Sequence, residues 1–201
     1  KYQPNYYLGF TIKPNIMGNI ASLFFRIKII NNISGLGKTF IKKNFFTLVI
    51  LLLYFFSLKK SYKIVFQNKN DYSFFTKYGI ANKKKSIIVP GSGIKLENLK
   101  NRNINSINKN LVFLFFGRIL IEKGINELLD SAKKIKEQYP KTQFIIMGSF
   151  EKENKNLYLE NKINKYNILN IIKHVPFSEK INDIIYKSDC VILPSYREGM
   201  P

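Results

Sequence analysis

Acidic residues are almost absent from the first 110 residues, which hold two of them against 19 Lys and Arg. Residues 111–201 hold 11 acidic and 14 basic side chains, so nearly all of the +20 net charge lies in the first 110 residues, the front half of the chain. An excess of Lys and Asn is typical of A/T-rich coding sequence, but codon drift does not explain why only one half lacks acids. Two interpretations of the front half therefore stay open, an anionic partner and a solvated basic face.

Cysteine and histidine are equally scarce. The single cysteine, Cys190, excludes a disulfide framework and a Cys-based zinc site. We expect it to be a small core residue, because it lies in an apolar segment. For the one histidine, His174, we expect a structural or solvent-facing role. Neither a Walker loop nor a G-x-G-x-x-G fingerprint occurs.

The hydrophobic run from Phe45 to Leu58 is too short to cross a bilayer comfortably. Its 14 residues would reach about 21 Å as a helix, whereas a bilayer core is about 30 Å thick. Lysines at 42, 43, 59 and 60 would also have to lie in or near hydrocarbon. We therefore expect a buried or interfacial helix, since an aromatic-rich helix edged by lysines can rest in a lipid interface.

Apolar segments alternate with amphipathic ones along the chain. The patterns predict strands at 29–33, 64–67, 86–89, 111–116, 143–147, 171–175 and 190–193, and helices at 14–27, 45–58, 70–78, 125–138, 154–165 and 179–187. Apolar strands between amphipathic helices predict an α/β fold with parallel sheets covered on both faces. Residues 95–110, rich in Asn, Lys and Ser, are typical of a linker between two domains.

The most informative stretch is Phe116-Gly117-Arg118-Ile119-Leu120-Ile121-Glu122-Lys123-Gly124, between an expected strand and an expected helix. Gly117 permits a close approach to the backbone at the carboxyl end of the strand. Arg118 and Lys123 flank a helix N-terminus, whose free N–H groups favour anions. These features together predict a phosphate site.

A second informative stretch closes the chain. Its strand delivers Pro194 and Ser195 at the carboxyl end, where ligands bind in open parallel sheets. Glu198 follows in a loop bounded by Gly and Pro. Alone, such a glutamate is ordinarily a solvated side chain.

Together the two stretches resemble a known family. Gly117-Arg118, Lys123-Gly124, a strand ending in Met147-Gly148, Val175-Pro176-Phe177, Asp189, Pro194-Ser195 and Glu198-Gly199-Met200-Pro201 are similar to the retaining glycosyltransferases of GT-B family 4, glycosyl transferases group 1. Residues 11–18, 31–37, 65–68 and 88–94 look like the acceptor-side domain of the branch that builds capsular, O-antigen and exopolysaccharide repeat units. The resemblance covers nearly the whole chain.

The resemblance implies a GT-B fold, with two Rossmann-like domains facing across a cleft. Residues 1–94 would be the C-terminal part of the acceptor-side domain, 95–110 the linker, and 111–201 the N-terminal part of the donor domain. The chain has no initiator Met and stops within an element, so we expect a fragment with both domains incomplete. The family's N-terminal Gly-rich loop and its second motif glutamate would fall outside, and the fragment alone is expected to be inactive.

For the donor phosphates, the resemblance implies that Arg118 and Lys123, beside Gly117, bind the diphosphate and offset the charge on the leaving group. No cofactor or metal is expected, since these cations would do that work and the sequence has no Asp-x-Asp pair. Family members carry a nucleoside-diphosphate sugar as substrate, with UDP as the first expectation.

For the sugar and the base, the resemblance implies three further contacts. Glu198 would be the first glutamate of the E-x7-E motif and the catalytic residue beside the transferred sugar. Backbone N–H groups of Gly199 and Met200 would hold the sugar hydroxyls, and the backbone near Val175 would contact the base. Many relatives carry a His near residues 34–37, and this chain has none there.

The expected partner is a polyprenyl-diphosphate-linked saccharide acceptor, reached at the inner face of the cytoplasmic membrane by a cytoplasmic, peripheral enzyme. The basic front half would suit that anionic surface, and no nucleic-acid partner is expected. Two alternatives stay open. One is a sugar-nucleotide synthase of the same fold with a soluble acceptor. The other is a non-catalytic basic module that binds membrane or nucleic acid.

Overall fold

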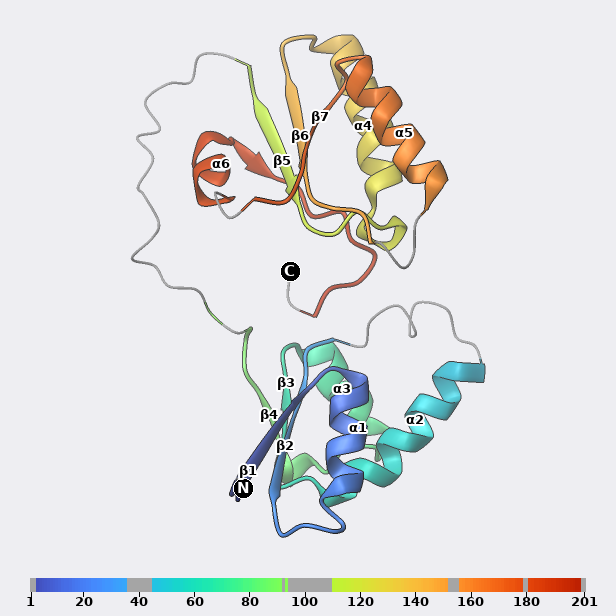
Figure 1. Ribbon diagram of the computed structural model, residues 1–201, viewed down its shortest axis with the longest axis vertical. Helices are drawn as coiled ribbons and strands as arrows, with labels where there is room; N and C mark the ends of the chain where they lie inside the picture. Colours follow the sequence, from blue (N-terminus) through green and yellow to red (C-terminus); the bar gives the residue numbers. More distant parts are fainter. Residues whose placement is uncertain are drawn as a thin grey trace. The chain divides into compact units, whose positions relative to one another are not determined.

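The computed structural model describes residues 3–35, 45–91, 93, 110–151, 156–178 and 181–199. The chain divides into two compact units, which we call unit 1 (residues 1–94 and 197–201) and unit 2 (residues 95–196). Each unit contains a four-stranded parallel sheet (Figure 1), so the expected α/β class is confirmed. The predicted linker, 95–110, lies outside the described residues except for Asn110, and the domain boundaries stay a prediction.

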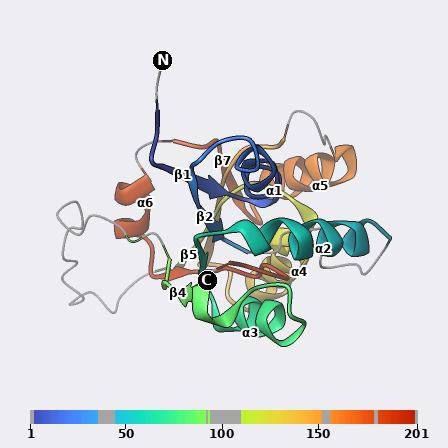
Figure 2. The same ribbon diagram turned by 90° about the horizontal axis from the view of Figure 1, so that it is seen from below.

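Unit 1 alternates strands with helices throughout. The elements are β1 (Tyr6–Phe10), α1 (Ile12–Ala21), β2 (Lys28–Ile33), α2 (Phe45–Ser57), β3 (Lys63–Phe66), α3 (Lys69–Lys77) and β4 (Ser86–Ile88), with short 3-10 turns at Leu58–Lys60 and Lys83–Lys85. The sheet order is β1-β2-β3-β4. Because each strand is added on the same side of the last, right-handed crossovers place the helices on one face, as Figure 2 shows.

Unit 2 is wound in both directions. Its elements are β5 (Val112–Phe116), a 3-10 turn at Ile121–Lys123, α4 (Ile125–Gln138), β6 (Gln143–Met147), α5 (Leu157–Ile168), β7 (Lys173–Val175), α6 (Ile181–Lys187) and β8 (Cys190–Val191). The sheet order is β7-β6-β5-β8. The crossover to β8 therefore runs opposite to the first two, and α6 lies on the other face from α4 and α5 (Figure 1).

The core of unit 2 lies under α4 and α5. Ile125, Leu129 and Ala132 are fully buried on the predicted stripe of α4 and pack with Phe144 and Ile146 of β6. These positions recur at the helical period and therefore lie on one face of α4. Both α4 and β6 have the bounds that the sequence predicts.

The core of unit 1 contains a cluster of aromatic side chains. Edge-to-face contacts join Phe75 to Tyr54 (centroids 5.3 Å apart) and to Phe66 (5.5 Å), an arrangement that adds to the stabilisation from area burial. Burial raises the pKa of Tyr54 to about 12; a hydrogen bond with Asn15 lowers it in part, and the charge of Asp71 raises it further.

Four buried polar residues, Asn15, Asn19, Asn31 and Ser61, tie α1 to β2 and to the start of β3. The Oδ1 atom of Asn31 accepts hydrogen bonds from Asn19 Nδ2 (3.0 Å) and Ser61 Oγ (2.5 Å). Its Nδ2 atom donates to the backbone oxygen of Asn15 (3.2 Å). The group is satisfied internally, which a buried polar cluster requires.

Replacing Asn31 with Ala is expected to lower the free energy of unfolding of unit 1 by about 2 kcal/mol, because it leaves buried polar groups without a partner. The exposed Asn70 provides a matched control, and Asn70→Ala should leave that free energy nearly unchanged. Urea unfolding followed by circular dichroism measures both. Equal losses in the two variants would contradict the role given to the cluster.

Three expectations need correction. The helix expected over 14–27 ends at Ala21, and Leu23 and Phe24 beyond it are exposed. Strand β1 was not predicted. Cys190 is exposed and not a core residue. It lies on the two-residue strand β8, which pairs only with β5 within the described sheet, and both residues of this strand are exposed.

Candidate functional site

The order of unit 2's sheet singles out one place on its edge. From β5 the chain passes to β6 on one side, whereas β8 joins β5 from the other side. In open parallel sheets the loops after two such strands part, and ligands bind between them. Here those loops are 117–124 after β5, which carries the predicted phosphate site, and 192–196 after β8, which belongs to the second informative stretch.

The loop after β5 begins in contact with the loop after β6. Gly117 N donates to Met147 O (3.0 Å), and Ile119 N donates to Ser149 O (3.2 Å). A side chain at Gly148 could not fit, because its Cβ would lie 1.9 Å from Gly117 O. These backbone pairs fix the course of the chain on both sides of Arg118.

Arg118 projects from this fixed loop. Its guanidinium forms an ion pair with Glu151, and its side chain is 65% exposed. An exposed pair of this kind contributes little to stability. The guanidinium is therefore accessible to an anionic ligand that could take the place of the carboxylate.

Lys123 ends the 3-10 turn that precedes α4, and its backbone N donates to Leu120 O (3.1 Å). The next residue, Gly124, has left-handed dihedral angles (φ 70°, ψ 27°), and no side chain caps the helix there. A Cβ on Gly124 would lie 2.1 Å from Pro194 O. Glycine thus lets the loop after β8 press against the helix N-terminus, which carries a partial positive charge.

Further contacts join the loop after β8 to the loop after β5 and to α4. Tyr196 N donates to Glu122 O (3.0 Å), and Tyr196 Oη donates to Glu127 Oε1 (2.6 Å). This hydrogen bond to Glu127 raises the pKa of the Tyr196 phenol. The Oγ atom of Ser195 is shielded from solvent and has no hydrogen-bond partner within the described residues. This hydroxyl is therefore a buried polar group beside the contact of the two loops, and the sequence alone assigns it no role.

Val175 and His174 lie on β7, next to the same sheet edge. Val175 O accepts a hydrogen bond from Gly148 N (3.0 Å), and His174 Nε2 lies 3.1 Å from Gly148 O. The His174 ring meets Phe150 edge to face, with centroids 5.7 Å apart. Both residues thus hold the glycine that approaches Gly117, and this agrees with a structural role for His174.

The segment with Glu198 packs within unit 1. Arg197 Nη2 lies 2.6 Å from Asp71 Oδ1, and Gly199 O accepts a hydrogen bond from Asn68 Nδ2 (2.7 Å). A Cβ on Gly199 would lie 1.8 Å from Ser34 O. Glu198, half-buried between these two anchored neighbours, therefore has its backbone fixed on both sides. Met200 lies outside the described residues.

Asp71 is the anchor that sequence reasoning missed. It is 1% exposed, and its backbone N donates to Oδ1 of Asn68, the N-cap of α3 (2.7 Å). Its carboxylate also accepts a hydrogen bond from Asn68 Nδ2 (3.0 Å), so the buried charge has one amide partner besides the partly exposed Arg197. A signal was present, because Asp71 is the sole acidic residue before Glu97.

Within the ranges that the structure describes, no group of three or more His, Cys, Asp or Glu side chains could hold a metal ion. Helices in the same ranges are all too short or too polar to cross a membrane. The expectation of a metal-free site and the roles given to single residues stay predictions.

A family model described as "Glycosyl transferases group 1" matches residues 97–201, more than half of the chain. The chain belongs to this family. Among curated relatives, an uncharacterised glycosyltransferase of Methanocaldococcus jannaschii is 28% identical over 167 residues, covering 80% of this chain and 40% of the relative. The N,N'-diacetylbacillosaminyl-diphospho-undecaprenol alpha-1,3-N-acetylgalactosaminyltransferase of Campylobacter jejuni is 26% identical over 208 residues, covering 94% and 52%. The chain thus spans about half the length, or less, of these relatives.

Solved structures share the fold. HepE of Anabaena in complex with UDP matches with a TM-score of 0.73 at 16% identity, covering 94% of this chain and 53% of that one. The sucrose-phosphate synthase of Thermosynechococcus elongatus matches with a TM-score of 0.78 at 14% identity, covering 98% and 52%. The GT-B fold expected from the resemblance is therefore confirmed.

Proposed function

We propose that the protein transfers a sugar from a nucleoside-diphosphate sugar, UDP-linked in the first instance, to a lipid-linked saccharide with retention of configuration, in cell-surface polysaccharide biosynthesis. The observation that carries this proposal is the junction of loops 117–124 and 192–196 at the point where unit 2's sheet reverses direction. It combines two cations with a helix N-terminus that no side chain caps.

In this proposal Arg118 and Lys123 bind the donor diphosphate beside Gly117 and the N-terminus of α4. Negative charge develops on the diphosphate as the bond to the sugar breaks, and fixed cations at that place stabilise the transition state more than the ground state. No cofactor is needed for this step, and the two cations do what a metal ion would otherwise do.

The remaining groups act on the sugar and the base. Glu198 lies beside the transferred sugar as the catalytic residue, while the backbone of Gly199 and Met200 holds its hydroxyls. The backbone of Val175 lies near the base. Support for Glu198 comes from its anchored neighbours, because a side chain between two fixed residues is preorganised.

For the acceptor, support comes from one relative and from charge. The name of the Campylobacter jejuni enzyme describes a diphospho-undecaprenol-linked acceptor. The front half of the present chain carries 19 cations and two acids, which suits a polyprenyl diphosphate at the anionic inner face of the cytoplasmic membrane. We place the enzyme there as a peripheral protein, with no nucleic-acid partner.

The test is a transfer assay on the full-length protein with UDP-sugars and two acceptors, a polyprenyl-diphosphate saccharide and a soluble sugar phosphate. We expect transfer to the lipid acceptor alone, and a product whose anomeric configuration by NMR equals that of the donor. Transfer only to the soluble acceptor would favour a synthase. Salt-sensitive nucleic-acid binding without any turnover would favour the non-catalytic module.

A further inference from the structure

Residues 197–199 lie at the carboxyl edge of unit 1's sheet. The segment belongs to unit 1, and it contacts the loop after β2, the loop after β3 and the first turn of α3. Strands β2 and β3 are neighbours in the sheet, so these contacts come from one place. Four residues hold the segment there, and we call them the anchor: Ser34, Gly35, Asn68 and Asp71.

Asn68 uses its whole side-chain amide in the anchor. Its Oδ1 atom accepts a hydrogen bond from Asp71 N (2.7 Å), as the N-cap of α3. Its Nδ2 group donates to Asp71 Oδ2 (3.0 Å) and to Gly199 O (2.7 Å). Because Oδ1 faces an N–H group, the other end of the amide must be the donor, which fits both acceptors. One side chain therefore begins the helix and fixes the backbone after Glu198.

Asp71 fixes the backbone before Glu198, through the ion pair of its buried carboxylate with Arg197. A buried ion pair contributes little net stability, because the cost of removing its charges from water offsets their attraction. Stability alone thus gives a poor reason for a carboxylate in this place. The position of Arg197, next to Glu198 in the chain, gives a better one.

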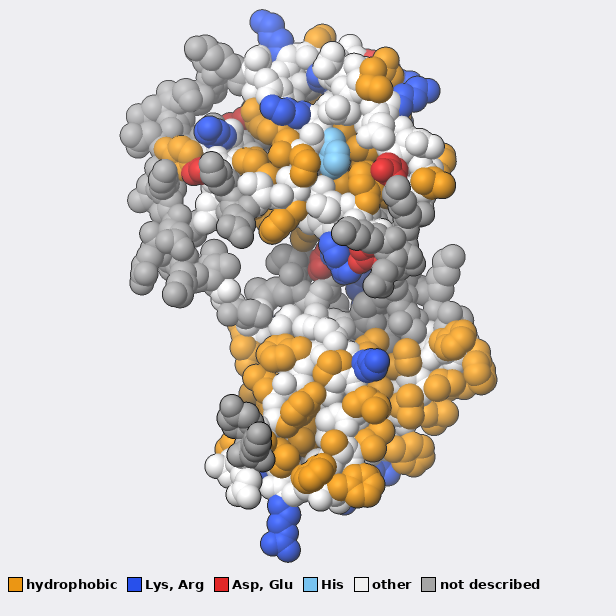
Figure 3. Space-filling view, viewed as in Figure 1, with side chains coloured by type: hydrophobic (Ala, Val, Ile, Leu, Met, Phe, Trp, Pro, Cys, Tyr) orange, Lys and Arg blue, Asp and Glu red, His pale blue; other side chains and the backbone are white. Residues whose placement is uncertain are grey.

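Acidic side chains are rare in unit 1. Residues 1–94 and 197–201 contain 16 Lys and Arg and only two acids, Asp71 and Glu198. In Figure 3, hydrophobic side chains cover much of the visible surface of unit 1, in the lower part of the view. The two acids nevertheless come together at one point, because Asp71 pairs with Arg197 and Glu198 is the next residue. This convergence favours a functional site over a chance ion pair.

The loop after β2 holds the same segment by close backbone contact. A Cβ on Gly199 would lie 1.8 Å from Ser34 O, and a Cβ on Gly35 would lie 2.9 Å from Gly199 Cα. Gly35 also has a φ of 123°, which residues with a side chain rarely adopt. Glycine is therefore needed on both sides of this contact.

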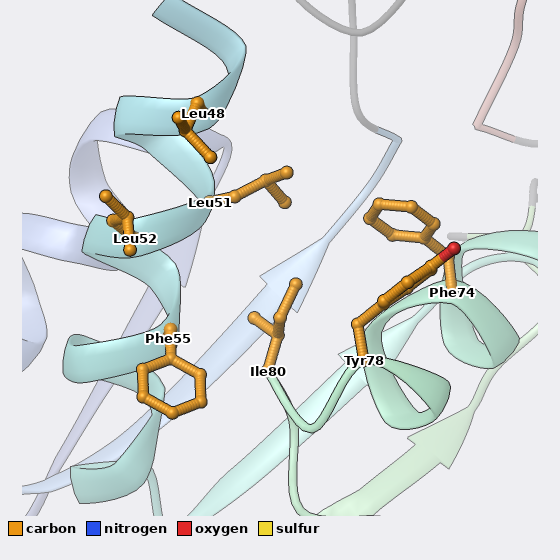
Figure 4. Close-up of a pocket in the computed structure, with 7 residues that line it drawn as sticks. All are labelled: Leu48, Leu51, Leu52, Phe55, Phe74, Tyr78 and Ile80. Atoms are coloured by element: carbon orange, nitrogen blue, oxygen red, sulfur yellow. The ribbon is translucent and has the colours of Figure 1, made fainter.

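Helix α3 gives the anchor a fixed base. Phe75 is fully buried in the aromatic cluster of unit 1. Figure 4 shows Phe74 and Tyr78 of α3 facing Leu51 of α2 across an apolar groove of about 320 Å³. Asp71 lies one helical turn before Phe74 and Phe75, so this packing also holds the turn that carries its charge.

We propose that Asn68 and Asp71 are positioning residues for sugar transfer, which hold residues 197–199 so that Glu198 stays beside the transferred sugar. The proposal rests on the proposed function and names the residues that set the place of its catalytic group. Neither residue needs to touch the donor. A displacement of about 1 Å can slow a reaction about 10²-fold, so loss of the anchor should lower kcat much more than donor affinity.

Asn68→Ser separates positioning from helix capping. Serine caps a helix about as well as asparagine, but it lacks the amide group that donates to Gly199 O. In the full-length protein with a UDP-sugar, we expect kcat to fall about tenfold or more, while KM and the melting temperature stay nearly unchanged. Parental kcat in Asn68→Ser would overturn the proposal.

Asn82→Ser is the matched control for that variant. Asn82 caps the 3-10 turn Lys83–Lys85 in the same manner, its Oδ1 accepting from Lys84 N (2.9 Å). It is exposed and belongs to unit 1, but it has no part in the anchor. Asn82→Ser should keep the parental kcat, and a loss as large as that of Asn68→Ser would contradict the proposal.

Variants of Arg197 and Asp71 test the ion pair. Arg197→Lys keeps the charge that Asp71 binds and should retain most of kcat, whereas Arg197→Gln and Asp71→Asn should each lower kcat about tenfold or more. The double variant Arg197→Gln with Asp71→Asn should lose no more than either single one, since both break one contact. Additive losses would contradict the proposal.

Asn31→Ala controls for stability. It removes buried hydrogen bonds from unit 1 without changing the anchor, so below its melting temperature it should keep the parental kcat. A loss equal to that of Asp71→Asn would assign the effect of Asp71 to stability and overturn its positioning role.

Hydrogen exchange distinguishes this proposal from the proposed function. The backbone amides of residues 197–199 should exchange about tenfold faster or more in Asn68→Ser than in the parent. Sugar transfer by the parent, with kcat and exchange unchanged in Asn68→Ser, would overturn the anchor and leave the proposed function standing. A parent without any transfer would refute the proposed function, and faster exchange in Asn68→Ser would then still support the anchor.

Discussion

Replacing Arg118 with Ala should lower kcat of the full-length transferase by about 10²- to 10³-fold, and Lys123→Ala should have a similar effect. Both cations are proposed to meet charge that grows as the diphosphate leaves, so their loss is expected in kcat more than in KM. Steady-state kinetics with a UDP-sugar measures the two constants. The double variant should lose less than the product of the single effects, because the two side chains act on one group.

The controls for this prediction lie nearby. Lys133→Ala removes an exposed cation from α4, far along the helix from its N-terminus, and should leave kcat unchanged.

Glu198→Gln should also reduce kcat strongly while leaving UDP binding intact. Unchanged turnover in the Arg118, Lys123 and Glu198 variants would refute the roles given to all three.

Replacing Gly124 with Ala should destabilise unit 2 by about 3 kcal/mol or more. Two causes add: a left-handed backbone that disfavours any side chain, and a Cβ that would lie 2.1 Å from Pro194 O. Relief of this clash would push the loop after β8 away from the N-terminus of α4. UDP affinity should therefore fall together with stability, measured by calorimetry and by hydrogen exchange of α4.

Gly79 is a matched control for the second cause. Its φ of 66° is close to that of Gly124, but a Cβ there would meet nothing within 4 Å. Gly79→Ala should thus cost only the conformational part, about 1 kcal/mol, and should leave UDP binding as it was. Similar losses in both variants would show that the contact with Pro194 does not matter.

Regular elements of this fold were largely predictable. The bounds of α4 and β6 follow from the sequence because one amphipathic stripe and one apolar run are each closed by polar residues. Strand β1 was missed because its sequence, Tyr-Tyr-Leu-Gly-Phe, includes a glycine and leaves four of five residues exposed. The end of α1 at Ala21 was also missed, because Leu23 and Phe24 continue the apolar spacing although they lie on the surface.

The candidate site was predictable only where it is local. Arg118 and Lys123 follow from a strand, a glycine and a helix start within nine residues of sequence. The ion pair of Asp71 with Arg197 joins residues 126 positions apart, and no local pattern reports such a contact. The same holds for Gly124 and Pro194, whose approach depends on the order of the strands in the sheet.

The central claim is that the loops after β5 and β8 form the donor phosphate site. A crystal structure of the full-length protein with UDP tests it most directly. We predict the diphosphate between loops 117–124 and 192–196, within hydrogen-bonding distance of the Arg118 guanidinium and the Lys123 ammonium group. A diphosphate bound at any other edge of the sheet, with both cations left in solvent, would contradict the claim.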